Sequence, residues 1–292
     1  MKKNILFFFL VCAFDSFSQE TDTLKLRHMY LQAQGIEKSF PDSALKVYAK
    51  IVEITKANPN QKVVGMSYNR LSDLIYSQKN DVKQRFDFNF KALSIFEAIK
   101  DSASIAQINE NIGIGLVEQR RYKEALKYHK EAYRYSVRKK LTSVLISSTM
   151  SIADCYSNMQ RVDSAVYYMK QLEDNFPKDA TKTSLALFYS NVGNTYYNLG
   201  EVTKNRSDYQ NAVNYAQKAK NLCLQYKLDE EDLAYNYGLQ GAGNLALDNF
   251  AEAQKNYLEA IKIYEAKKLN FQLNQMYFEV TMLFMKMGEK EK

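Results

Sequence analysis

The stretch NENIGIGLVEQRRYKEALKYHKEAY spans residues 109–133 and carries small residues among larger apolar ones at helical spacing. The small residues are Gly113, Ala125 and Ala132. Two antiparallel helices can approach closely only where a small residue faces the partner, while bulky residues three and four positions away fill the grooves. The stretch therefore predicts two packed helices, with Gly113 on the first and both alanines on the second.

The same pattern recurs along the chain about every 40 residues, for example in SIADCYSNMQRVDSAVYYMKQLED, residues 151–174. A lone helix pair cannot bury its apolar face, so neighbouring pairs must stack. The small site of the first helix indicates seven first helices, at Gln32, Ser72, Gly113, Ala153, Gly193, Gly241 and Thr281. The small sites of six second helices fall at Ala44, Arg85, Ala125, Ala165, Ala212 and Ala253, and seven residues later at Ile51, Ala92, Ala132, Leu172, Ala219 and Ala260.

The composition agrees with a helical globular protein. The 292 residues include 10 Gly and 3 Pro, where average usage would give roughly 35 in all, so a turn-rich all-β fold is excluded. Hydrophobic residues make up 46% and charged residues 25%, which excludes a disordered tail because there is enough apolar surface for a core.

The spaced small residues resemble those of the tetratricopeptide repeat, and the resemblance covers residues 24–292. It implies an all-α fold, a right-handed α-solenoid of antiparallel helix pairs in which the first helices line a concave groove. We expect a signal peptide at 1–18 and a solenoid at 19–292. Its six repeats lie near 24–60, 65–100, 105–140, 145–178, 185–228 and 233–268, with a half repeat at 272–292.

Three features depart from the family pattern. The period of about 40 exceeds the usual 34 or so and implies longer helices, as in the repeat regions of bacterial sensor proteins. Gln32 and Arg85 occupy nominally small sites and are expected to weaken the first two repeats. The polar stretch EVTKNRSD, residues 201–208, is expected to form a longer loop between two helices.

The N-terminus has the pattern of a secretory signal peptide. Lys2 and Lys3 precede an apolar run at residues 5–14 that is too short to span a bilayer, and Ser16 and Ser18 suit cleavage before the next residue. Val11 stands before Cys12, where a lipoprotein would need a small residue. We therefore expect an exported chain, periplasmic or associated with the cell envelope, with no membrane span and no lipid anchor.

Few residues suggest chemistry, so we predict no enzyme, no cofactor and no metal. His28 and His129 are interpreted as structural, because no carboxylate or Cys recurs beside either one. Cys155 and Cys223 fall on different helices and are expected to be buried thiols, although a disulfide stays open in an exported chain. The acidic residues 229–232 precede an apolar helix and are interpreted as a helix cap.

The remaining candidate site is the groove. Residues beside the small sites of the first helices should face it, and Lys and Arg, which a carboxylate clamp requires, are absent from these positions. An extended peptide with some positive charge would suit such a surface; the alternative is that its polar residues only keep it hydrated. The candidate residues are Asn69, Asp73, Tyr76, Gln107, Glu110, Met150, Asp154, Asn158, Asn194, Tyr197, Asn198, Tyr235, Leu245, Phe278, Met282 and Met285.

Two functions follow from this surface. The chain is an exported scaffold that binds a protein or peptide partner, or it is the extracytoplasmic sensor region of a longer signalling protein with a histidine kinase or DNA-binding regulator. Export argues against a nucleic acid as partner. The segment LFMKMGEKEK, residues 283–292, is interpreted as the end of a first helix and the start of a turn, and its uncovered apolar residues suggest self-association through this helix.

Overall fold

The computed structural model describes residues 23–59 and 61–290, which form thirteen helices and no strand. The first helix covers residues 23–36. The others are α2 (Pro41–Ile54), α3 (Lys62–Lys79), α4 (Val82–Ala98), α5 (Ser102–Glu118), α6 (Tyr122–Lys139), α7 (Thr142–Asn158), α8 (Val162–Asp174), α9 (Lys182–Thr203), α10 (Arg206–Tyr226), α11 (Glu230–Ala246), α12 (Phe250–Ala266) and α13 (Asn270–Lys290). The expected signal peptide lies outside the described residues. None of the described helices combines the length and the apolar character that a bilayer-spanning segment needs.

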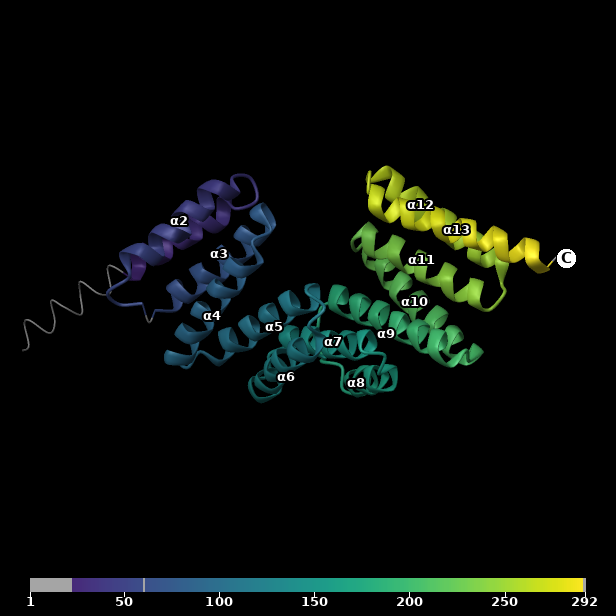
Figure 1. Ribbon diagram of the computed structural model, residues 1–292, viewed down its shortest axis with the longest axis horizontal. Helices are drawn as coiled ribbons and strands as arrows, with labels where there is room; N and C mark the ends of the chain where they lie inside the picture. Colours follow the sequence, from purple (N-terminus) through teal and green to yellow (C-terminus); the bar gives the residue numbers. More distant parts are fainter. Residues whose placement is uncertain (1–22, 60, 291–292) are drawn as a thin grey trace, which may run out of the picture. The chain divides into compact units, whose positions relative to one another are not determined.

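The helices belong to two compact units, Met1–Gly115 and Leu116–Lys292, which meet within α5. In the N-terminal unit, residues 23–36 and the helices after them pack around a core that includes Tyr48 and Leu71. In the C-terminal unit, consecutive helices pack as antiparallel neighbours (Figure 1). There α7 also contacts α9, α9 contacts α11 and α11 contacts α13, so the first helices of successive pairs lie side by side.

Most of the small sites lie where helices meet, as the spacing predicts, but Thr281 of the last helix is exposed, so that site was predicted wrongly. All six sites at the start of the second helices are buried, with Arg85 the most exposed at 8%. A Cβ atom added at Gly193 would lie 3.2 Å from the backbone oxygen of Ala212 on α10, so α9 and α10 approach closely because this side chain is absent. The first site was placed one residue too early, because Ala33 is buried while Gln32 is exposed and hydrogen-bonds to His28.

Arg85 occupies a small site and packs its guanidinium group against an aromatic ring. Its guanidinium carbon lies 4.2 Å from the centre of the Tyr76 ring, a cation–π contact. A Cβ atom added at Gly115 of α5 would lie 3.5 Å from the same guanidinium carbon. That is an ordinary contact distance, whereas the same Cβ atom would lie only 3.2 Å from the Phe86 ring, so the glycine on α5 chiefly makes room for Phe86 of α4.

Most helices end on a left-handed residue that is not glycine. Among the described residues, φ is positive at Asn80, Lys100, Arg120, Lys140, Gln160, Lys204, Lys227, Asp248 and Lys268. At most of these ends the next amide donates to a carbonyl five residues earlier, as Leu141 does to Ser136 at 3.0 Å. This is the Schellman arrangement, which usually uses glycine. The use of Lys, Arg, Gln and Asp in these Schellman arrangements is consistent with the low glycine content.

Two expectations about helix ends were wrong. Residues 201–208 form no long loop, because α9 runs to Thr203 and α10 begins at Arg206, which makes these helices 22 and 21 residues long. Asn205 between them caps α10 by accepting a hydrogen bond from the Ser207 amide at 3.0 Å. The expected turn at the C-terminus is helical instead, because α13 continues to Lys290.

Two other expectations are confirmed. Asp229 caps α11 by accepting a hydrogen bond from the Glu231 amide at 2.8 Å, and this bond lowers the pKa of its carboxyl group. Cys155 and Cys223 are buried thiols, and no disulfide joins them. In the described part of the chain, no group of three or more His, Cys, Asp and Glu side chains is arranged to hold a metal ion.

Candidate functional site

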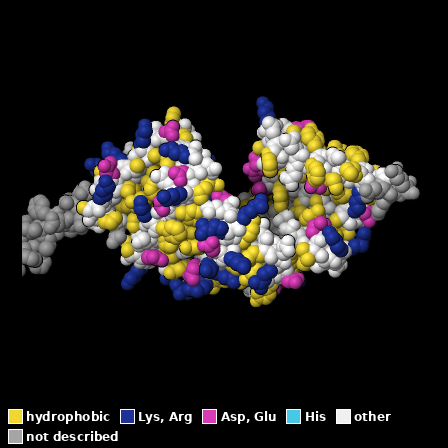
Figure 2. All heavy atoms as spheres, in the orientation of Figure 1, with side chains coloured by type: hydrophobic (Ala, Val, Ile, Leu, Met, Phe, Trp, Pro, Cys, Tyr) yellow, Lys and Arg dark blue, Asp and Glu magenta, His cyan; other side chains and the backbone are white. Residues whose placement is uncertain are grey.

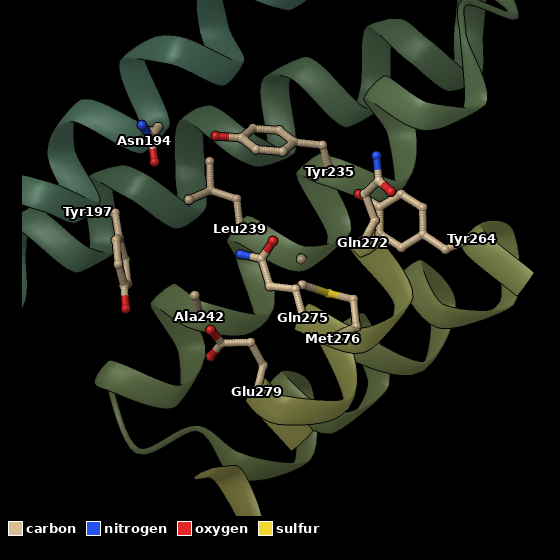
Figure 3. A pocket seen from close by; sticks show the side chains of 11 residues that line it. Asn194, Tyr197, Tyr235, Leu239, Ala242, Tyr264, Gln272, Gln275, Met276 and Glu279 are labelled. Carbon is tan, nitrogen blue, oxygen red and sulfur yellow. The ribbon is translucent and has the colours of Figure 1, made fainter. Parts of the chain in front are cut away.

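The C-terminal unit contains a cavity of about 200 Å³ on the face formed by its last three first helices. Figure 3 shows side chains from α9, α11 and α13 pointing into it, with Tyr264 of α12 at one side. Its lining combines phenol rings, amides, apolar groups and one carboxylate: Asn194, Tyr197, Tyr235, Gly238, Leu239, Ala242, Tyr264, Gln272, Gln275, Met276 and Glu279.

The cavity exists because α11 carries small residues where it passes between α9 and α13. Gly238 and Ala242 lie one helical turn apart and so face the same side. A Cβ atom at Gly238 would lie 3.2 Å from the sulfur of Met276, so the missing side chain lets α13 pack closely. Leu239 and Met276 are buried and give the cavity an apolar floor.

The electrostatic character of the cavity is anionic. Glu279 is half-buried, and burial raises the pKa of its carboxyl group. Tyr257, fully buried on α12, donates a hydrogen bond from its hydroxyl to Glu279 at 3.3 Å. Burial and the neighbouring carboxylates Glu201 and Glu279 raise the pKa of Tyr197 to about 12. No Lys or Arg lines the cavity.

Three of the predicted groove residues lie in this cavity, namely Asn194, Tyr197 and Tyr235. Two others, Asp154 and Asn158, are exposed on α7, where the Asn158 amide donates to the Asp154 carboxylate at 3.0 Å. The pKa of Tyr235 is raised by burial and by the charge of Asp154. Asp154 therefore lies close enough to the cavity to add to its negative potential.

His129 gains a neighbour that the sequence did not indicate. It is fully buried on α6. Neighbouring protein atoms partly withdraw the Asp154 carboxyl group from water and raise its pKa, although the side chain still reaches the surface, and the electrostatic interaction with His129 opposes this rise. Asp154 therefore comes near His129 in the folded chain, although no carboxylate recurs beside His129 in the sequence. The complete burial of His129 agrees with a structural role.

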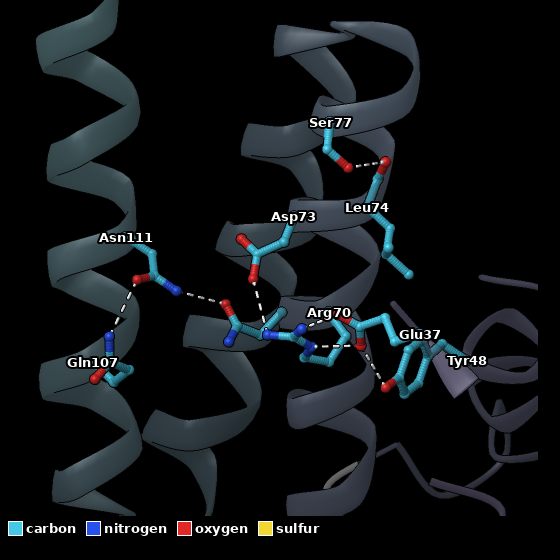
Figure 4. A network of polar contacts seen from close by, with 9 residues as sticks. Glu37, Tyr48, Arg70, Asp73, Leu74, Ser77, Gln107 and Asn111 are labelled. Atoms are coloured by element: carbon cyan, nitrogen blue, oxygen red, sulfur yellow. Dashed lines mark hydrogen bonds and ion pairs between the residues drawn. The ribbon is translucent and has the colours of Figure 1, made fainter. Parts of the chain in front are cut away.

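The predicted residues Asn69, Asp73 and Tyr76 lie on α3 in the N-terminal unit, beside a network of polar contacts (Figure 4). Arg70 is its centre, because it donates to Glu37 at 3.0 Å and pairs with Asp73 at 3.4 Å.

Other hydrogen bonds extend this network. The Tyr48 hydroxyl donates to Glu37 at 2.9 Å. On the side of α5, the Asn111 amide donates to Asn69 at 2.8 Å, and the Gln107 amide donates to Asn111 at 3.2 Å. Glu37 and Asp73 thus already have Arg70 beside them, and Arg70 adjoins the predicted position Asn69 without being one of the groove positions named from the sequence.

Glu110 is a further correction, because it is 2% exposed and does not face an open groove. It stands three residues before the small site Gly113, a place that Ser190 occupies in α9. Ser190 is also buried, and it donates a hydrogen bond to Asn236 of α11 at 3.0 Å. Residues at this place lie toward the side of a first helix, where a neighbour packs.

The sequence pattern missed Glu279, Gln272 and Gln275 on α13. These side chains stand on the flank of α13 that faces α11, and not at the positions beside the small sites that the pattern marks. Their spacing of three and four residues is the signal that could have found them. Phe278, Met282 and Met285, which were predicted, are exposed on α13, over which hydrophobic side chains gather in Figure 2.

Sequence comparison finds no protein-family model and no curated protein that matches this chain. The fold, however, matches solved structures. BtubC from P. vanneervenii is 16% identical, with a TM-score of 0.61 over 85% of this chain and 92% of that chain. A Rap protein complexed with competence and sporulation factor is 14% identical, with a TM-score of 0.56 over 92% and 88%.

A third match is a signal transduction ATPase with numerous domains and a tetratricopeptide repeat sensor, from Pyrococcus horikoshii. It is 12% identical with a TM-score of 0.66, and the match covers 91% of this chain and 38% of that chain. These structures confirm the resemblance at the level of fold: the chain has an all-α fold of the tetratricopeptide-repeat type.

Proposed function

We propose that this chain is a protein-binding repeat module that holds an extended peptide segment on the first-helix face of its C-terminal unit. The observation that carries the proposal is the cavity, where aromatic, amide and apolar side chains from α9, α11 and α13 converge. Such a mixture is typical of a binding pocket, because apolar groups contribute burial and a few polar groups fix orientation.

The lining suits a peptide because an extended backbone has unpaired amides and carbonyls. Asn194, Gln272 and Gln275 can each donate and accept hydrogen bonds from such a backbone. Leu239 and Met276 can bury part of a side chain. The structurally similar Rap protein is complexed with competence and sporulation factor, which supports a peptide or protein as the partner class.

The proposal includes export, for which the pattern of residues 1–18 is the support. A second candidate function is the extracytoplasmic sensor region of a longer signalling protein. The archaeal match favours it, because there the repeat fold is named as a sensor and this chain spans only 38% of that protein. Mass spectrometry of the exported protein should find Gln19 as its first residue, and a retained Met1 would contradict export by this route.

Peptide display on the purified chain tests the binding function. Random heptapeptides selected on the wild-type protein should lose at least about tenfold in affinity on a Tyr197→Ala, Tyr235→Ala variant, because both rings line the cavity. Tyr167→Ala, which removes a 59% exposed ring of α8 away from the cavity, is the matched control and should bind like the wild type. Equal binding to all three proteins would contradict the proposal. It would favour the alternative that the polar residues of this face only keep it hydrated.

A further inference from the structure

Three shielded carboxylates of the described residues lie beside a cation, whereas Glu279 does not. Glu37, with a side chain 13% exposed, pairs with Arg70. Asp101, at 16%, pairs with Lys62 at 2.7 Å, and Glu173, at 27%, lies 3.6 Å from Lys218. Half-buried Glu279 instead receives a hydrogen bond from the neutral hydroxyl of Tyr257.

A carboxylate withdrawn from water without a positive partner is costly, and ligands of opposite charge relieve that cost. The other residues that line the cavity suit such a ligand. Tyr197 and Tyr235 offer ring faces, which attract cations, and the amide oxygens of Asn194 and Gln275 can accept N–H groups. Figure 3 shows the Glu279 carboxylate on the same side of the cavity as Tyr197.

The size of the cavity points to one side chain and not to a whole small molecule. About 200 Å³ is smaller than the roughly 300–1,000 Å³ typical of pockets for drug-sized ligands. Beside it, α13 presents Phe278 and Met282, 62% and 42% exposed, on the helical face that follows from Gln275. A peptide could therefore place one residue in the cavity and lay apolar neighbours along α13.

We propose that this cavity binds the cationic side chain of a Lys or Arg residue in a peptide, with the Glu279 carboxylate as its counter-ion and the apolar face of α13 beside it. The inference rests on the proposed peptide-binding function and specifies its ligand. The net charge of the whole chain is +7, which repels cationic peptides. A preference for them must therefore come from local groups such as these.

Four pools of displayed heptapeptides test the proposal, each with random flanks and a central Arg, Lys, Gln or Glu. On the wild-type chain we expect the Arg and Lys pools to be recovered about tenfold above the Gln pool, and the Glu pool least. On Glu279→Gln the four pools should be recovered within about twofold of each other. Glu279→Lys should reverse the order and favour the Glu pool.

Glu252→Gln is the matched control, since it removes the same charge from an exposed site on α12 and should keep the wild-type order. Thermal unfolding of each variant checks that it is folded. Equal recovery of all pools on the wild-type chain, or an unchanged Arg and Lys preference on Glu279→Gln, would overturn the cationic site while peptide binding itself stands. Recovery of no pool above a blank surface would overturn the proposed function as well.

Discussion

Gly241→Ala adds one methyl group at the tightest helix contact beside the cavity. The new Cβ atom would lie 2.5 Å from Cε1 of Tyr257, where carbon atoms normally stay about 3.5–4.0 Å apart. The ring would have to move by about 1 Å, yet it is fully buried and its hydroxyl is bonded to Glu279. Overpacking of this kind costs about 1–3 kcal/mol, against about 1 kcal/mol gained when Ala replaces Gly in a helix.

We therefore expect Gly241→Ala to lower the free energy of unfolding by about 1 kcal/mol. Gly35→Ala is the control, because a Cβ atom there meets nothing within 4 Å, so the helix gain of up to about 1 kcal/mol should be the whole effect. Urea unfolding followed by circular dichroism measures both. If Gly241→Ala stabilises the protein as much as Gly35→Ala does, α11 and α12 are not packed as described.

Three further predictions concern charge, surface and helix ends. Because burial raises the pKa of Glu279, the folded chain holds this proton more tightly than the unfolded chain, so the contribution of Glu279 to stability is fully present below the ordinary pKa of a glutamate and is lost as the pH rises through the raised pKa. The affinity for an Arg peptide should change with pH in the opposite direction, because the peptide needs the ionised carboxylate. Fluorescence anisotropy should show that binding is lost as the pH falls through the raised pKa, and a pH-independent affinity would contradict the role of Glu279. Tyr197 and Tyr257, which face this carboxyl group from α9 and α12, have raised pKa values and stay neutral in this range. Sedimentation should show self-association through α13 that Met282→Glu with Met285→Glu suppresses, whereas a monomeric parent at high concentration would refute it. Lys140→Gly should raise the free energy of unfolding by up to about 1 kcal/mol, because φ is 53° there, and an unchanged urea midpoint would count against strain at this helix end.

The sequence could predict the helix pairs because close packing restricts which residues can stand at the contact. Ala125, Ala165 and Ala212 are fully buried at the predicted places. The same rule failed for Gln32, since the burial of Ala33 shifts the register by one residue. Where one repeat departs from the pattern, packing in the folded chain decides which residue faces the neighbouring helix, and the sequence alone does not show this.

The candidate site was predicted only in part. Asn194, Tyr197 and Tyr235 stand beside small sites and do line the cavity. Glu110 stands at a similar place and is buried. The cavity itself depends on missing side chains such as that of Gly238, and a sequence pattern indicates where a residue points but not the space left between helices.

The lengths of the helices were also predicted only in part from the sequence. Residues 201–208 are polar, which favours a loop, but Thr203 and Arg206 belong to helices that extend toward each other. Gly200 lets them do so, because a Cβ atom there would lie 2.7 Å from the Tyr209 ring. Tertiary packing thus overrides local polarity at this place.

Methionine methyl NMR tests most directly whether the cavity between α9, α11 and α13 is the binding site. Met276 lies in its floor, whereas Met169 is buried elsewhere in the same unit and Met66 packs in the N-terminal unit. Addition of an Arg-containing peptide recovered from the pools should shift the methyl signal of Met276 and leave Met169 and Met66 in place. A shift at Met66 with none at Met276 would contradict the account.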